Sequence, residues 1–74
     1  MQEQIMRSAL HKITNTLERE NSGGYANRFV MRKLEQLENG WLVVYDRFKD
    51  TGKLETRVMY FDDELNDKWS MIAQ

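Results

Sequence analysis

Apolar residues recur at every third or fourth position through the first twenty residues of the chain. This stripe consists of Ile5, Met6, Ala9, Leu10, Ile13 and Leu17. Such spacing is typical of an amphipathic helix that buries one face. Asn21-Ser22-Gly23-Gly24 follows the stripe, and glycine readily adopts the left-handed conformation that ends many helices. We therefore predict a helix over residues 2–21.

Two turn signals bracket a segment rich in aromatic and β-branched residues. Asn39-Gly40 is the dipeptide that best tolerates the two positive φ angles of a type I′ turn. Asp50-Thr51-Gly52 suits a three-residue turn that is closed by a left-handed glycine. The sequence Trp-Leu-Val-Val-Tyr-Asp-Arg-Phe lies between them, and its composition favours a strand. We predict antiparallel strands over about residues 41–49 and 53–61.

Residues 25–38 fit two different periods. The apolar positions of a helical period are Ala26, Phe29, Val30, Leu34 and Leu37. Those on one face of a strand are Phe29, Met31 and Leu37. The Asn39-Gly40 turn requires a partner strand before it, which favours a strand over about residues 28–38. If the segment is helical, the sheet shrinks to a single hairpin.

The end of the chain fits a short helix over about residues 63–73. Leu65, Trp69 and Ile72 share one helical face, and Asp62 or Asp63 can cap its start. The predicted fold is therefore a single α+β domain, residues 1–74. In it, an N-terminal amphipathic helix packs on a three-stranded antiparallel meander that a short C-terminal helix closes.

Turn geometry predicts the register of the sheet. The pairs set by the first turn are Leu37 with Leu42, Glu35 with Val44 and Leu34 with Tyr45. The pairs set by the second turn are Phe48 with Leu54, Arg47 with Glu55, Tyr45 with Arg57, Val44 with Val58 and Trp41 with Phe61. This register places apolar residues beside one another and an arginine beside a glutamate.

The two faces of the predicted sheet differ in character. We expect the N-terminal helix to cover the more uniformly apolar face, which carries Phe29, Met31, Leu37, Leu42, Val44, Phe48, Leu54, Val58 and Tyr60. The other face mixes aromatic and arginine side chains and carries Val30, Arg32, Leu34, Trp41, Val43, Tyr45, Arg47, Arg57, Met59 and Phe61. Either the C-terminal helix buries the Trp41/Phe61 end of this mixed face, or the face stays open as a contact surface.

Composition excludes several classes of function. The chain has no cysteine, so disulfides, thiolate chemistry and cysteine zinc sites are ruled out. Its net charge of −1 provides no overall attraction to nucleic acid or to a membrane. No apolar run approaches the ~20 residues of a membrane span, and we expect no signal peptide before the first helix. A small domain without disulfides favours a cytoplasmic location.

Catalytic signals are weak. The single histidine, His11, lies beside the apolar stripe and is interpreted as a surface residue. None of the serines stands in a nucleophile-elbow context; they are Ser8, Ser22 and Ser70. The late acidic residues match no calcium loop, and helix capping accounts for them. We therefore predict no enzymatic activity, no cofactor and no metal site.

The order helix–strand–strand–strand–helix resembles that of double-stranded-RNA-binding domains. That family has a basic start to its last helix, whereas the matching stretch here is Asp62-Asp63-Glu64-Leu65-Asn66-Asp67-Lys68. The segment from Gly40-Trp41 to Phe61-Asp62, with the helix after it, is similar to the DNA-binding domains of phage integrase arms and plant ethylene-response factors. In those domains an open sheet face enters the major groove, and the resemblance implies Arg32, Trp41, Arg47 and Arg57 as the matching positions.

We expect the mixed face to be the functional surface. Its predicted partner-binding residues are Arg32, Trp41, Tyr45, Arg47, Arg57, Met59 and Phe61, and aromatic and arginine residues are enriched at interaction hot spots. The favoured hypothesis is a small non-catalytic regulator that acts through protein–protein contacts. Its partner is another protein or a second copy, as for a phage-encoded or accessory inhibitor or adaptor. The alternative is a nucleic-acid-binding module whose aromatic residues stack on bases.

Overall fold

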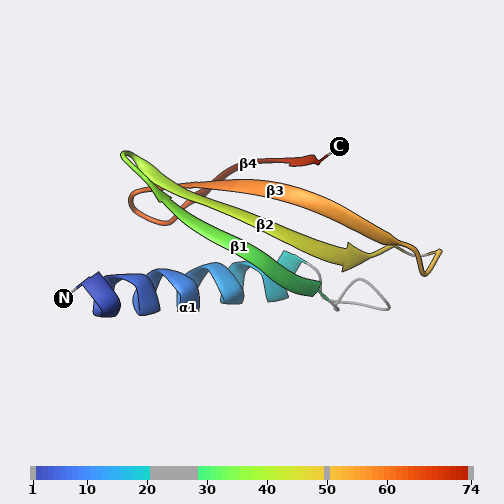
Figure 1. Cartoon of the computed structure of the whole chain (residues 1–74), viewed down its shortest axis with the longest axis horizontal. Helices are drawn as coiled ribbons and strands as arrows, with labels where there is room; N and C mark the ends of the chain where they lie inside the picture. The colour runs from blue at the N-terminus through green and yellow to red at the C-terminus, as the bar shows by residue number, and fades with distance from the viewer. Residues whose placement is uncertain (1, 21–28, 50, 74) are drawn as a thin grey trace.

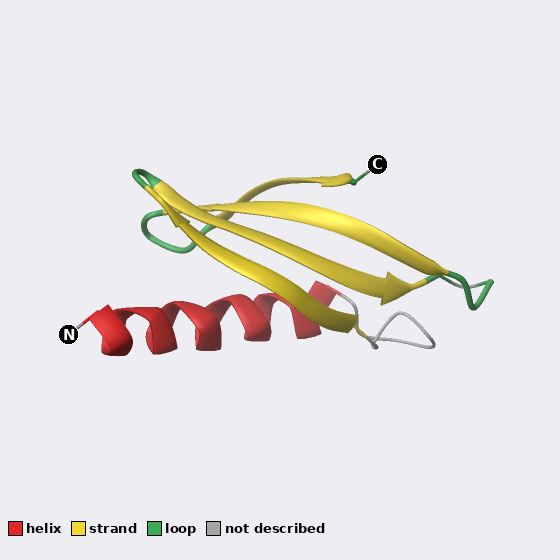
Figure 2. Cartoon of the chain, viewed as in Figure 1, coloured by secondary structure: helices red, strands yellow, loops and turns green. Residues whose placement is uncertain are grey.

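The computed structural model describes residues 2–20, 29–49 and 51–73. Its elements are α1 (Gln2–Glu20), β1 (Phe29–Leu37), β2 (Gly40–Phe48), β3 (Leu54–Asp62) and β4 (Asp67–Ile72). The strands form an antiparallel sheet in the order β1-β2-β3-β4, and α1 runs along one side of it (Figures 1 and 2). The α+β class, the N-terminal helix and the three predicted strands are confirmed. The predicted helix stop at residues 21–24 and the start of the ambiguous segment, residues 25–28, lie outside the described residues.

The predicted C-terminal helix is wrong, because the chain makes a tight turn after β3 and then forms β4. Asp62 Oδ1 accepts hydrogen bonds from the backbone amides of Glu64 and Asn66, at 3.0 and 2.9 Å. Leu65 adopts a left-handed φ of 67°, which a helix does not allow. The bond from the Asn66 amide is the main cause that lowers the pKa of Asp62. The predicted helix cap is therefore wrong: Asp62 instead closes a turn that leads back along the edge of β3.

The register between β2 and β3 is confirmed along its length, from Trp41 opposite Phe61 to Phe48 opposite Leu54. Gly52 lies in the turn between these strands with φ +86°, as the turn signal predicts. Asp50 of the same turn lies outside the described residues. The aromatic and β-branched composition of both strands, with a glycine where φ must be positive, explains why this part could be derived from sequence.

The register between β1 and β2 differs from the prediction by two residues. The turn is centred on Glu38 and Asn39, and Gly40 already belongs to β2, where it lies opposite Leu37. Neither Asn39 nor Gly40 has a positive φ, so the predicted type I′ turn is wrong. Gly40 is needed for a close approach instead, because a Cβ atom there would lie 2.2 Å from the backbone oxygen of Phe61.

A β-bulge in β1 changes the face to which successive side chains point. Between Met31 and Lys33 the register shifts by one residue, which leaves Arg32 as the extra residue of the strand. Phe29 and Met31, which precede the bulge, therefore share a sheet face with Leu34, which follows it. All three pack against the core. An uninterrupted alternation had assigned Leu34 to the opposite face.

α1 covers the mixed face, for which the sequence predicted either partial burial by a C-terminal helix or an open surface. The buried apolar core consists of Ala9, Ile13, Leu17, Trp41, Val43, Tyr45, Met59 and Phe61. Both faces carry apolar residues, but in the described part of the chain this face carries four aromatic side chains, Phe29, Trp41, Tyr45 and Phe61, against three on the other, and burying aromatic rings removes a large apolar area from water. The remaining stripe residues of α1 stay exposed; they are Ile5, Met6 and Leu10.

Substitutions at Gly40 distinguish a close approach from a turn conformation. We expect Gly40→Ala and Gly40→Asn to lower the free energy of unfolding by similar amounts, of order 2–3 kcal/mol, because either Cβ displaces the Phe61 backbone. Urea denaturation measures this loss. Gly52→Asn is the matched control: asparagine tolerates a positive φ and its Cβ meets nothing within 4 Å, so the cost should be about 1 kcal/mol or less. Full stability of Gly40→Asn would contradict the close-approach explanation.

Candidate functional site: the outer face of the sheet

Four of the seven predicted partner-binding residues belong to the hydrophobic core. Trp41, Tyr45, Met59 and Phe61 are buried beneath α1. The ring of Phe29 packs edge-on against Tyr45 with centroids 6.3 Å apart. Burial also raises the pKa of the Tyr45 phenol, although the nearby Arg57 opposes this effect. α1, and not a C-terminal helix, therefore buries the Trp41/Phe61 end of the mixed face, and Tyr45 is buried with it.

Arg47 and Arg57 lie on the helix side of the sheet and converge on one buried carboxylate. Arg47 Nε and Arg57 Nη1 donate hydrogen bonds to Glu55 Oε2, at 2.9 and 3.2 Å. Arg57 Nη2 also donates to Ser70 Oγ at 3.1 Å. Burial by itself raises the pKa of Glu55, but the hydrogen bonds from the two arginines outweigh burial and hold that pKa below its ordinary value. These arginines therefore tie β2, β3 and β4 together within the chain.

Arg32 lies on the opposite side of the sheet. Its Nε donates to Asp46 Oδ2 at 2.6 Å, and Thr56 Oγ1 donates to Asp46 Oδ1 at 2.6 Å. The bond from Thr56, followed by the bond from Arg32, lowers the pKa of Asp46. The seven predicted residues are thus divided between two sides of the sheet and do not form one surface.

The sheet face that α1 leaves open is called the outer face below. Strand alternation and register assign to it Val30, Arg32, Lys33, Glu35, Leu37, Leu42, Val44, Asp46, Phe48, Leu54, Thr56, Val58, Tyr60, Asp62, Trp69 and Met71. Two rows of three apolar residues cross its centre on β2, β3 and β4. The rows are Leu42–Tyr60–Trp69 and Val44–Val58–Met71, and together they are called the apolar grid.

The apolar grid is open to water. Trp69 and Met71 on β4 are 47% and 55% exposed, and the other four members are intermediate in exposure. The ring of Trp69 stacks on that of Tyr60, with centroids 5.7 Å apart and planes inclined by 18°. The Tyr60 hydroxyl donates to the backbone oxygen of Asn39 at 3.0 Å. These contacts hold both aromatic rings in place across β3 and β4.

Paired charges surround the apolar grid. The ion pairs are Arg32–Asp46 at 2.6 Å, Lys33–Glu35 at 3.0 Å and Asp62–Lys68 at 3.6 Å. Each pair joins one positive and one negative side chain, so this rim has no net charge. An apolar centre within a polar rim is the usual arrangement of a protein interface.

The sequence pattern did not assign Trp69 and Met71 to this surface. The helical period predicted for residues 63–73 grouped Trp69 with Leu65 and Ile72. The true signal is the alternation of Trp69 and Met71 with Ser70, which is too short to distinguish a strand from a helix.

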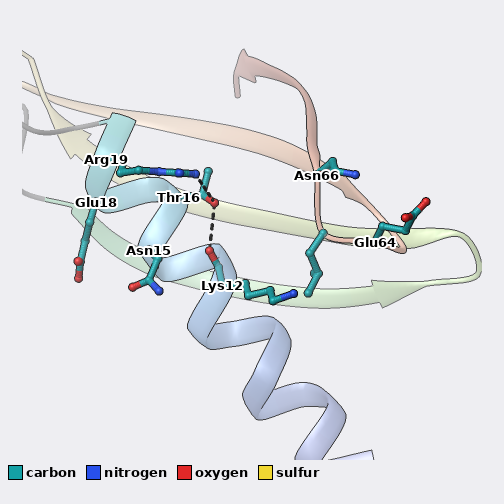
Figure 3. Close-up of a pocket in the computed structure, with 8 residues that line it drawn as sticks. Lys12, Asn15, Thr16, Glu18, Arg19, Glu64 and Asn66 are labelled. Atoms are coloured by element: carbon teal, nitrogen blue, oxygen red, sulfur yellow. Dashed lines mark hydrogen bonds between the residues drawn. The ribbon is translucent and has the colours of Figure 1, made fainter.

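A second surface feature is an open groove of about 690 Å³ between α1 and the turn after β3 (Figure 3). Its lining residues are Lys12, Asn15, Thr16, Glu18, Arg19, Glu64, Leu65 and Asn66. The buried Thr16 hydroxyl donates to the backbone oxygen of Lys12 at 3.0 Å and accepts a bond from Arg19 Nη2 at 3.4 Å (Figure 3). The charged side chains of the lining include both signs. Because its buried polar group is satisfied within α1, the groove is a weaker candidate site than the outer face.

Among the residues that the structure describes, no group of three or more histidine, aspartate or glutamate side chains is placed to hold a metal ion. No helix in the described ranges is long and apolar enough to cross a lipid bilayer. Comparisons with protein-family models, curated proteins and solved structures found no match to this chain.

The Asp46 cluster gives the fold a pH dependence. Because its pKa is lowered in the folded state, the Asp46 carboxylate stabilises the fold above its unfolded pKa, and this contribution is lost as pH falls through the folded pKa. We expect the melting temperature of the parent to fall more steeply between about pH 5 and pH 3 than that of Asp46→Asn. Asp63→Asn makes the same charge change at an exposed position and should follow the parent. Melting temperatures are measured by circular dichroism. If those of the parent and Asp46→Asn fall equally as pH is lowered, the stabilising role of the Asp46 carboxylate is contradicted.

Proposed function

We propose that this chain is a small non-catalytic binding protein that acts through protein–protein contacts at the outer face. The observation that carries the proposal is the apolar grid, which remains open to water while α1 packs on the other side of the sheet. A contiguous patch of large apolar side chains with a polar rim is typical of an interaction site. The helix side stabilises the fold, and the outer face is left for binding.

The residue types of the grid support a protein partner. Tyrosine, tryptophan and methionine are enriched in the buried centres of interfaces, and charged residues are depleted there. The grid contains Tyr60, Trp69 and Met71 and has no charged member. The stacked pair of Tyr60 and Trp69 is already ordered, which reduces the entropy lost when a partner binds.

The alternative, nucleic-acid binding, has less support. Arg32, Arg47 and Arg57 each donate a hydrogen bond to a carboxylate of the same chain. Trp41 and Tyr45 lie in the core and provide no stacking platform. The balanced rim of the outer face supplies no excess positive charge for phosphate contacts.

Site-specific photocrosslinking tests the outer face as the contact surface. The photoreactive residue p-benzoylphenylalanine is placed at Met71 and, as the matched control, at Met6, which is 42% exposed on α1. On irradiation in the cells from which the gene comes, we expect a protein crosslink from position 71 and much less from position 6. Mass spectrometry identifies the crosslinked protein. No crosslink from position 71 above the level of the control would contradict the proposal.

A further inference from the structure

We infer that the partner of the outer face is a second copy of this chain, so that two sheets pack face to face in a symmetric dimer; the inference rests on the proposed function. In a two-fold dimer each copy contributes the same patch, and that patch must be complementary to itself. The charge, shape and area of the outer face all meet this requirement.

The charges of the outer face require no counterpart from a partner. Each of the six rim charges is neutralised within its own chain, in the pairs Arg32–Asp46, Lys33–Glu35 and Asp62–Lys68. A second copy therefore brings no net repulsion to the interface. A neutral rim provides no electrostatic attraction to a strongly charged partner. Burying that partner's charges without counterions on this face would disfavour binding.

The exposure of the apolar grid is graded across the sheet. Trp69 and Met71 on β4 are the most exposed members, whereas Leu42 and Val44 on β2 are partly shielded. A two-fold axis parallel to β3 reverses the strand order, so β4 of each copy lies over β2 of the other. The large exposed side chains of one copy then meet the smaller side chains of the other, which suits packing between sheets about 10 Å apart.

The area of the outer face approaches that of a standard interface. Strands β1, β2 and β3 have nine residues each. With β4 six residues long, strands about 4.8 Å apart and about 3.4 Å per residue give a face of about 540 Å² in flat projection. Standard interfaces bury about 800 Å² of accessible surface per partner, a value that includes the relief of the side chains.

Self-association also compensates for the small core. The described part of the chain buries eight apolar side chains, and chains of this length commonly gain further burial by forming oligomers. A second copy is present wherever the protein is made, whereas a different partner is not. Dimerisation therefore covers the apolar grid whenever the protein accumulates.

The open edge of β4 offers a second route to a dimer, but its geometry is less favourable. The amide of Ala73 donates to the backbone oxygen of Thr56 at 2.9 Å. Residues of an antiparallel strand alternately point their amide and carbonyl groups toward the partner strand and away from it. Because Ala73 points toward β3, Ser70 and Ile72 point their amide and carbonyl groups toward the open edge. The register shift at Lys68 adds a bulge and a charge to the same strand, and both discourage edge pairing.

Sedimentation equilibrium of the purified chain tests the dimer. We expect the parent to reach twice the mass of one chain with increasing concentration. Met71→Lys should raise the dissociation constant of the dimer at least about tenfold, because it would bury an ammonium group that lacks a partner. Met6→Lys makes the same substitution on α1 and should dimerise like the parent. Circular dichroism shows whether both variants keep the fold.

Tryptophan quenching tests the interface in the unmodified protein. Trp41 is buried in the core, whereas Trp69 lies on the apolar grid. As the parent is diluted and the dimer dissociates, quenching by acrylamide should increase because Trp69 becomes accessible. Trp69→Phe should remove this dependence on concentration, which assigns the change to the grid. If acrylamide quenching stays constant while the parent is diluted until the dimer dissociates, the face-to-face arrangement is contradicted. This measurement does not depend on whether Met71→Lys folds.

The outcomes separate this inference from the proposed function. A monomeric parent whose position 71 crosslinks to a different protein would overturn the homodimer and leave the proposed function standing. A dimer that Met71→Lys does not weaken would place the contact at the β4 edge or on α1 and would also overturn the inference. A monomeric parent with no crosslink from position 71 would overturn both.

Discussion

The hydrogen-bonded register of β2 and β3 is the constraint on which the rest of the structure depends. It sets Trp41 beside Phe61 on one face and Val44 beside Val58 on the other. Because side chains alternate strictly between the faces of a sheet, one register assembles both the core and the apolar grid. A shift by a single residue would exchange the two sets. The pairing that creates the core for α1 is therefore also what creates the outer face.

One helix can cover only part of a four-stranded sheet. An α-helix with its side chains is about 10–12 Å across, whereas four strands extend over roughly 19 Å. On the helix side, Ser70 and Ile72 of β4 remain exposed, whereas Trp69 and Met71 lie on the outer face, where no described helix packs. The apolar side chains of the outer face are thus left over from an architecture that has one helix to bury two apolar faces. This imbalance is the physical basis for a binding function.

Two buried carboxylates determine the role of the arginines. Asp46 holds Arg32 on the outer side, and Glu55 holds Arg47 and Arg57 on the helix side. In both places the carboxylate is less exposed than the arginines around it. Arginine beside aromatic residues is a common pattern of contact surfaces, but here the same pattern arises from ion pairs that connect neighbouring strands. The outer face gains a neutral rim as a result.

Local signals in the sequence were enough to locate several elements. Helical spacing located α1, and β-branched composition with Gly52 at a positive φ located β2, β3 and their register. The presence of two apolar sheet faces could also be derived. Gly40 was recognised as special, although for a turn conformation and not for its contact with Phe61.

Tertiary structure decided the features that depend on competition between distant segments. The face on which α1 packs is not encoded in the local pattern, because both faces carry apolar residues and the core forms on only one of them. The Arg32 bulge moved Leu34 to the core side, which no uninterrupted period reveals. Residues 67–72 became β4 because β3 offered an open hydrogen-bonding edge, whereas their own spacing fitted a helix equally well. The candidate site followed from these three outcomes, since a surface is defined by what the rest of the chain leaves uncovered.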